Sequence, residues 1–341
     1  MQKLLKKFLQ NSPWLFFHAP TAPYILYLGL KARNLLFFTY TNPCMIEGKA
    51  IRMAKSRILS HIDDEFRPNM LKVKSKDPFE LLQSQFREVG LTYPVVAKPD
   101  YSERGFGVEK IQNDTELASY HTRMNGQYII QEFLEDPYEL GVLYYRFPEE
   151  ERGQIYSVSV KDLLSVTGDG VSTLEALMDK DPKRNYMKSQ KKKFQDRLNT
   201  VPAKGEKIVI NFIGQHLVGA QFNDSRYLIT DELVASFDRI CKKIPGFHYG
   251  RFDLKASDLD QFKAGKGFKF LELNGTASIP IHIWDPDISV WEAYRTIFYH
   301  WKLVYEIAMQ NMRLGRTGVS YKEAFAGLKA RFSRNEQIVP E

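Results

Sequence analysis

The stretch that decides the fold reads Phe268-Lys269-Phe270-Leu271-Glu272-Leu273-Asn274-Gly275, in which apolar and polar residues alternate as they do in a strand. Glu272 and Asn274 are two residues apart, so on one strand they point to the same face. A second alternating run, Arg251-Phe252-Asp253-Leu254, precedes them across a polar loop. If the two runs pair as antiparallel strands, Asp253 joins Glu272 and Asn274. Two carboxylates and an amide oxygen form an all-oxygen set that suits Mg²⁺.

A second interpretation makes Asp253 and Glu272 ordinary exposed strand residues. Against it, both residues sit in runs rich in phenylalanine and leucine. An isolated carboxylate in apolar surroundings is costly, so a metal or an ion pair is expected at these positions.

Two glycine-containing turns add to this set. The run Val95-Val96-Ala97-Lys98-Pro99-Asp100 predicts a buried strand that ends at Lys98, and Gly105-Phe106-Gly107 follows as a loop that could approach phosphate oxygens. Alone this is neither a Walker A motif nor GxGxxG, and a plain turn before a surface strand fits as well. The Gly168-Asp169-Gly170 turn opens a helix, with Ser172 or Thr173 as its N-cap, and it could meet an anion or be structural only.

Composition limits the class of protein. The 341 residues carry a formal net charge of +7, which suits anionic partners such as nucleotides or acidic lipid. Zinc spacing, a helix-turn-helix signature and an RNP motif are not found, so a nucleic-acid partner is not expected. Two cysteines, Cys44 and Cys241, are too few for a disulfide framework, which indicates a reducing, cytoplasmic location.

The N-terminal segment is basic and aromatic. It lacks the small-residue cleavage site of a signal peptide, and prolines interrupt it too often for a transmembrane helix. Leu4, Leu5, Phe8 and Leu9 share one helical face, with lysines elsewhere. That face could contact an anionic membrane or pack on the protein's own core.

The order of elements predicts an α+β fold with mostly antiparallel sheets, because helical and strand patterns do not alternate as regular βαβ units. Helices are expected over 49–64, 78–89, 116–124, 231–243 and 290–312, and an aromatic stripe from Trp291 to Tyr305 on the last is interpreted as core. Strands are expected over 93–98, 128–133, 140–147, 154–164, 249–255 and 268–273, and 208–213 with 217–222 is interpreted as a hairpin around Gly214.

Taken together and in order, the motifs resemble the ATP-grasp superfamily over residues 49 to 300, most closely D-alanine–D-alanine ligase. The stretch from Val166 to Leu174 is similar to the cyanophycin synthetase group. The resemblance implies two α/β lobes that clasp ATP, preceded by a reduced, mainly helical N-terminal segment. The expected division is 1–48 for that segment, 49–135 for the small lobe and adenine linker, 136–318 for the C-terminal lobe and 319–341 for a tail.

The resemblance also implies residue roles. The residues that would hold ATP are Lys55, Lys98, Gly105, Gly107, Gln131, Glu132, Leu134 and Glu139. The ligands for Mg²⁺, or for Mn²⁺ as the alternative metal, would be Asp253, Glu272 and Asn274. The catalytic residues would be Arg251, at the oxyanion, and Lys161, near the phosphates.

These roles imply an ADP-forming ligase that activates a carboxylate as an acyl phosphate and joins it to an amine. The chain departs from the family in two places: only about 48 residues precede the Lys55 helix, and the run from Gly275 to His282 replaces the usual Ser-Pro-Gly pattern. We therefore expect a small carboxylate and an amine without naming them. Two alternatives stay open, a non-ligating ATP-binding scaffold at a membrane and phosphoryl transfer without an amine step.

Overall fold

The structure is a computed structural model that describes residues 18–43, 54–101 and 105–326. The chain divides into two compact units, one formed by residues 1–159 and 224–341 and the other by residues 160–223. No helix in the described ranges is long and apolar enough to cross a membrane. The predicted division into four segments remains a prediction.

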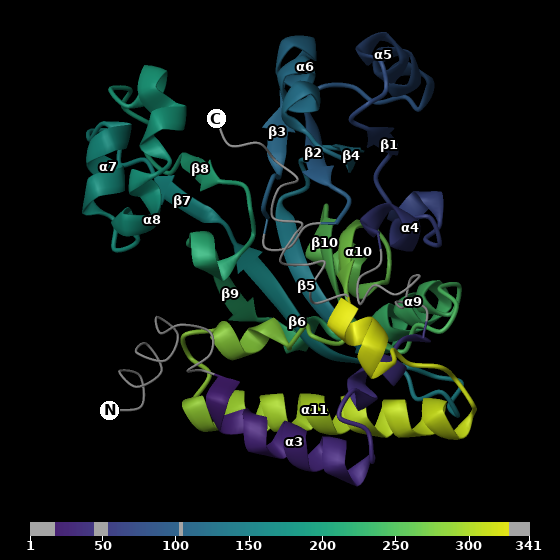
Figure 1. Cartoon of the computed structure of the whole chain (residues 1–341). Coiled ribbons are helices and arrows are strands. Elements are labelled where there is room, and N and C mark those ends of the chain that lie inside the picture. The colour runs from purple at the N-terminus through teal and green to yellow at the C-terminus, as the bar shows by residue number, and fades with distance from the viewer. Residues whose placement is uncertain (1–17, 44–53, 102–104, 327–341) are drawn as a thin grey trace. The chain divides into compact units, whose positions relative to one another are not determined.

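The first sheet of the larger unit is a four-stranded antiparallel sheet in the order β1-β4-β2-β3 (Figure 1). Its strands are β1 (Met70–Lys74), β4 (Gln127–Glu132), β2 (Val95–Pro99) and β3 (Glu109–Ile111). Helices α5 (Phe79–Glu88) and α6 (Asp114–Arg123) complete this part. Leu82, Leu117, Val95 and Ile130 belong to the apolar core on one face of the sheet. Alternation along the strands therefore leaves Lys98 and Gln131 on the opposite face.

The second sheet has five strands in the order β11-β10-β5-β6-β9. They are β11 (Phe268–Asn274), β10 (Tyr249–Ala256), β5 (Tyr138–Tyr145), β6 (Gln154–Asp162) and β9 (Gln221–Asp224). Helix α9 (Asp231–Cys241) places Phe237 against Phe252 and Phe270, with ring centroids 5.6 and 5.4 Å apart. This aromatic core fixes which face of β10 and β11 is buried.

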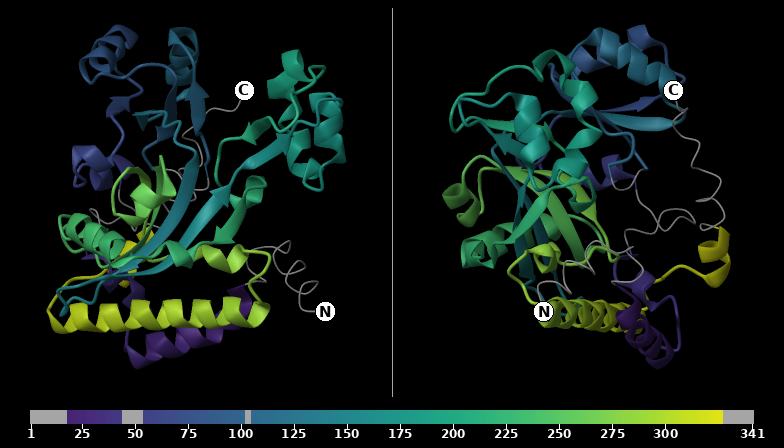
Figure 2. Two further views of the ribbon diagram at one scale, coloured as in Figure 1. Left: turned by 180° about the vertical axis from the view of Figure 1, so that it is seen from behind. Right: turned by 90° about the vertical axis from the view of Figure 1, so that its left-hand side faces the viewer.

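The long helix α11 (Val290–Arg313) and the N-terminal helix α3 (Ala22–Lys31) lie side by side in all views (Figures 1 and 2). The turns η1 (Ala19–Thr21) and η2 (Phe37–Tyr40) flank α3, and Leu303, Val304 and Ile307 of α11 pack in the same core as Leu28. The described N-terminal residues are mainly helical, as predicted. The aromatic stripe on α11 is core only in part, because Trp291 is 74% exposed.

The smaller unit contains β7 (Leu164–Thr167) paired antiparallel with β8 (Lys207–Asn211). Helices α7 (Leu174–Lys180) and α8 (Arg184–Lys188) and the turn η5 (Lys191–Arg197) complete it, around a core of Leu174, Met178 and Ile208. The predicted hairpin around Gly214 is wrong, because β8 pairs with β7 while β9 joins the five-stranded sheet. The turn η6 (His216–Val218) replaces the start of the second expected strand, and β9 begins only at Gln221.

The predicted α+β arrangement with mostly antiparallel sheets is confirmed. The helix expected over 49–64 is wrong in length, because α4 spans only Lys55–Leu59 and the preceding residues 44–53 lie outside the described part. The strand β1 was not expected from the sequence. The remaining short elements are η4 (Asp64–Phe66), η7 (Arg226–Leu228), α10 (Leu259–Lys263) and η8 (Ile281–Trp284).

Candidate active site

The three residues expected to bind the metal meet on β10 and β11. Asp253 lies directly opposite Glu272, and Arg251 lies opposite Asn274. Residues in such pairs have Cβ atoms about 4.5–5.5 Å apart, so both carboxylates share one small area. The Nδ2 of Asn274 donates to Oδ2 of Asp253 over 3.0 Å, and Nε of Arg251 donates to its Oδ1 over 3.1 Å. The side chains predicted from the sequence are therefore gathered around one carboxylate.

A β-bulge at Leu271 decides which way these side chains face. Asp253 pairs with Glu272, while the next residue, Leu254, pairs with Phe270, so Leu271 is the extra residue of β11. Strict alternation would have put Glu272 and Asn274 on the same face as Phe268 and Phe270. With the bulge, Phe270 stays in the aromatic core and Glu272 turns to the other face with Asp253.

Lys98 brings the four-stranded sheet to this bulge. Its Nζ donates to the carbonyl oxygen of Leu271 over 3.1 Å and to Oε1 of Gln131 over 2.6 Å. Burial, helped by the nearby Lys55 and opposed by Glu272, Asp100 and Asp253, lowers the pKa of Lys98 from 10.5 to about 8. Burial and a second cation thus disfavour the protonated, charged form of Lys98, and a bound anion would favour that form again.

The amide of Gln131 has a defined orientation. An ammonium group can only donate, so the atom that faces Lys98 must be the carbonyl Oε1. Gln131 is 2% exposed, and its Nε2 has no hydrogen-bond partner among the described residues. A role for Oε1 as acceptor from the amine of adenine would therefore compete with Lys98. The group of Gln131 that could bond a ligand is therefore the Nε2 N–H donor.

Lys55 reaches the metal residues from the first turn of α4. Its Nζ lies 3.6 Å from Oε1 of Glu272, and the Lys55 side chain is only 10% exposed. Asp100 holds this turn: its backbone oxygen accepts from the Lys55 amide, and its carboxylate accepts from both N and Oγ of Ser56 at 2.9 and 2.8 Å. Asp100 is completely buried, and Nζ of Lys72 is 3.7 Å away.

Asp100, Ser56 and Lys72 had no predicted role. Asp100 was visible in the sequence as the residue that ends the Lys98 strand, but nothing there showed that it would cap another element. Lys72 belongs to the strand that was not expected.

The expected adenine linker follows β4. The carboxylate of Glu132 accepts from the backbone N of Asn69 and from Nζ of Lys269, each over 3.1 Å. Leu134 and Glu139 are buried, 6% and 7% exposed, and Glu139 lies opposite Lys255 in the pairing of β5 with β10. Glu132 thus forms an ion pair with Lys269, and Glu139 lies on β5, which pairs with the strand that carries Asp253.

The glycine loop is described at Gly105 and Gly107, while residues 102–104 lie outside the described part. Both glycines have positive φ values, 71° and 69°, which other residues rarely adopt. The Tyr120 hydroxyl donates to the Gly107 carbonyl over 2.8 Å and anchors the loop to α6. The sequence therefore needs glycine here for the turn itself, whatever the loop binds.

Lys161 and the Gly168–Gly170 turn belong to the smaller unit. Lys161 lies on β6 and is 7% exposed. Asp169 accepts from the backbone N and Oγ of Ser172 over 2.6 and 2.7 Å and from the backbone N of Val171 over 2.9 Å, and these bonds lower its pKa to about 2. Thr173 caps α7 by accepting from Ala176. The turn is thus closed by its own side chains.

The donors at Asp253 suit a hard cation. Among the described residues no group of three His, Cys, Asp or Glu side chains could hold a metal by itself. Asp253, Glu272 and the amide of Asn274 supply three oxygen donors, and Mg²⁺ commonly takes its other ligands from water and phosphate. The residues present therefore fit a Mg²⁺–nucleotide complex better than a metal held by protein alone.

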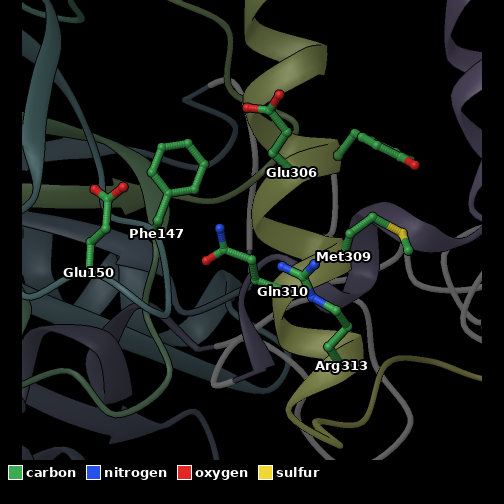
Figure 3. Close-up of a pocket in the computed structure, with 7 residues that line it drawn as sticks. Phe147, Glu150, Glu306, Met309, Gln310 and Arg313 are labelled. Atoms are coloured by element: carbon green, nitrogen blue, oxygen red, sulfur yellow. The ribbon is translucent and has the colours of Figure 1, made fainter.

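A separate hollow of about 400 Å³ lies along α11, away from these residues in the sequence (Figure 3). Glu306, Gln310 and Arg313 of α11 line it opposite Phe147 and Glu150. None of the residues predicted to hold ATP or metal lines it.

Comparison with known proteins gives structural matches only. No family model and no curated protein matches the sequence. Among solved structures, the chain is similar to a bifunctional glutathione synthetase from Pasteurella multocida (16% identity, TM-score 0.39), covering 73% of this chain and 35% of that one. It is also similar to a D-Ala:D-Ser ligase from Enterococcus faecalis, with 14% identity and a TM-score of 0.42, covering 79% of this chain and 64% of that one.

A D-alanine–D-alanine ligase from Bacillus anthracis is similar over 82% of this chain and 70% of its own length, with 13% identity and a TM-score of 0.41. The chain spans about a third of the glutathione synthetase and just under two thirds of the D-Ala:D-Ser ligase.

Proposed function

We propose that this chain is an ATP- and Mg²⁺-dependent ligase that activates a carboxylate as an acyl phosphate and joins it to an amine. One observation carries the proposal: Lys55 of α4 and Lys98 of β2 both reach β11, Lys55 at the Glu272 carboxylate and Lys98 at the Leu271 carbonyl. Cations for phosphate and oxygen donors for a metal thus occupy one place, as transfer of a phosphoryl group requires.

Each residue has a role in this proposal. Asp253, Glu272 and Asn274 would hold Mg²⁺, which when bound spreads the negative charge of the β- and γ-phosphates. Lys55 and Lys98 would bind the phosphate oxygens directly. Lys55 now faces Glu272, an ion pair that nucleotide phosphate would share.

The positive charge of Arg251 would stabilise the oxyanion that forms at the carbonyl group during the reaction. Its guanidinium bonds Asp253 at 3.1 and 3.2 Å and is fixed there by the paired strands. A substrate carboxylate oxygen would attack the γ-phosphorus, forming the acyl phosphate and releasing ADP. The amine would then attack the carbonyl carbon, the oxyanion would form near Arg251, and loss of phosphate and one proton would give the amide.

The adenine would lie along the Gln131–Leu134 linker, with Gln131 donating from Nε2 to a ring nitrogen and Glu139 accepting from the ribose. The role of Lys161 near the phosphates stays a prediction from the sequence. The substrates are a small carboxylic acid and an amine, with amino acids or peptides as the first class to examine.

The test is a screen of carboxylic acids and amines with ATP and Mg²⁺, measuring ADP and phosphate and identifying the product by mass spectrometry. Glu272→Gln removes one carboxylate charge and should reduce substrate-dependent ADP release by at least about a hundredfold. Glu80→Gln, on the exposed face of α5, is the matched control and should leave the rate unchanged.

Three outcomes decide between readings. Undiminished turnover in Glu272→Gln contradicts the metal assignment. ATP binding without ADP release in any mixture favours the scaffold alternative, and a phosphorylated product in place of an amide favours simple phosphoryl transfer.

A further inference from the structure

Helix α3 (Ala22–Lys31) has an unusual composition for a surface helix. Its sequence, Ala-Pro-Tyr-Ile-Leu-Tyr-Leu-Gly-Leu-Lys, contains a single charged residue, at the last position. A helix that is apolar all round is normally covered on all sides. The question is therefore which sides of α3 the described residues cover.

The inner side of α3 is covered by α11. Leu28 is 3% exposed and belongs to the core that includes Val304 and Ile307. Tyr24 meets Phe298 with ring centroids 5.1 Å apart, and Nζ of Lys31 lies 5.3 Å from the centre of the Tyr305 ring. These contacts fix which side of α3 faces outward.

The outer side of α3 is exposed. Leu26, Tyr27 and Leu30 are 53%, 55% and 65% exposed, and Leu35 just beyond the helix is 48% exposed. Spacings of three and four residues put Leu26, Tyr27 and Leu30 on one face of the helix. We call these four residues the α3 face. Contiguous apolar surface of this kind marks an interaction site.

The N-terminal part of the chain that contains the α3 face carries charge of one sign. Lys31 and Arg33 lie at its end and are exposed. Residues 1–46 contain five Lys or Arg and no Asp or Glu, since the first acidic residue is Glu47. The other 295 residues contain 43 Lys or Arg and 41 Asp or Glu, so +5 of the formal net charge of +7 belongs to these first 46 residues.

This charge selects the occupant. A second copy of the chain would bring Lys31 and Arg33 close to the same two cations of the first copy, and like charges repel. An anionic partner is favoured instead. A helix with exposed leucine and tyrosine on one side and flanking cations fits a lipid interface, where apolar side chains enter the acyl boundary and cations meet headgroups.

We propose that the α3 face docks on an anionic lipid surface, with Leu26, Tyr27 and Leu30 inserted and Lys31 and Arg33 at the headgroups. The inference does not depend on the ligase activity, because no residue of α3 belongs to the candidate active site. Residues 1–17 are basic in sequence, and the proposal rests instead on residues 26–35, whose exposed side chains the structure describes.

The experiment is co-sedimentation of the full chain with unilamellar vesicles. One set is phosphatidylcholine alone, and the other contains about a third phosphatidylserine. We expect binding to the anionic vesicles that weakens between 50 mM and 500 mM salt, because screening shortens the range of the attraction. Binding to both vesicle types alike, or to neither, overturns the proposal.

Variants test the face itself. The double variant Leu26→Asp with Leu30→Asp should lower the partition coefficient at least tenfold, because both side chains would otherwise leave water. Lys31→Gln should lower it about fivefold, the loss expected for one basic residue near an anionic surface. Leu81→Asp on α5, where Leu81 is 45% exposed, is the matched control and should bind as the unmodified chain does.

Other occupants give different results. If the double variant binds vesicles as well as the Leu81→Asp control, the α3 face is not the lipid contact and the proposal is wrong. If light scattering shows a dimer that the double variant dissolves while vesicle binding is unchanged, the face is an interface between copies. Unchanged thermal unfolding of the variants excludes misfolding as the cause of lost binding.

Discussion

The buried amine of Lys98 leads to a prediction about pH. Burial, helped by Lys55, lowers its pKa from 10.5 to about 8, so the group is about nine-tenths charged at pH 7 and about one-tenth charged at pH 9. If only the charged amine binds phosphate, the Kd for the Mg²⁺ complex of a non-hydrolysable ATP analogue should rise about tenfold from pH 7 to pH 9. The phosphates carry their full charge across this range and add little to the slope.

Lys98→Arg is the matched variant for this experiment, because a guanidinium stays charged far above pH 9. Its Kd can differ in absolute value but should be nearly independent of pH between 7 and 9. Calorimetric titration at each pH gives both profiles. A flat profile for the unmodified chain, or the same slope in Lys98→Arg, would refute the reasoning that the Lys98 charge is both titratable and needed.

The same pKa predicts a stability effect of definite sign. The folded chain binds fewer protons at Lys98 than the unfolded chain between about pH 8 and 10.5, so folding becomes more favourable as pH rises through that window. Below about pH 8 the full cost is present, roughly 3 kcal/mol at about 1.4 kcal/mol for each pKa unit. Lys98→Arg should lack this rise in the free energy of unfolding.

Two further predictions concern neighbours of Lys98. Asp100→Ala removes a buried carboxylate that accepts from Ser56 N and Oγ, so it should lower the free energy of unfolding by roughly 3 kcal/mol in a denaturant titration. It should also weaken ATP binding in calorimetry, because Asp100 holds the α4 turn that carries Lys55. A loss of stability below about 1 kcal/mol would show that Asp100 does not hold the turn. Gln131→Glu puts a carboxylate where Oε1 now lies, 2.6 Å from the Lys98 amine, and should therefore raise the Lys98 pKa. The midpoint of the pH profile of the Kd should then move above pH 8. An unmoved midpoint would mean that the two side chains do not interact in solution.

Local sequence patterns predicted much of the fold. The period-two runs around Asp253 and Phe270 predicted β10 and β11, and the helical periodicity from residue 290 predicted α11 nearly to its last residue. These patterns can be recognised in the sequence because each element buries one side against a core, so its apolar residues recur at the period of a strand or helix. Strand β1 was not predicted, because its five residues, Met70–Lys74, alternate too briefly to stand out from the surrounding polar residues.

Pairing between distant segments was predicted less well. The runs around Gly214 read as a hairpin because they are adjacent in sequence, yet β8 pairs with β7 and β9 joins the larger sheet. Gly219 adopts φ 95° after the short turn at His216–Val218, which ends one run before the other begins. Strand propensity shows that a segment can pair but not with which partner.

The sequence by itself determined the chemistry of the candidate site: the amines of Lys55 and Lys98, the oxygen donors of Asp253, Glu272 and Asn274, and a cationic N-terminus. Only the tertiary structure decided how they meet. The bulge at Leu271 turns Glu272 away from the phenylalanine core and offers a carbonyl to Lys98, and Asp100 caps the turn of Lys55 from 45 residues away. Side-chain type is a local property, whereas strand register and burial depend on segments that are distant in the chain.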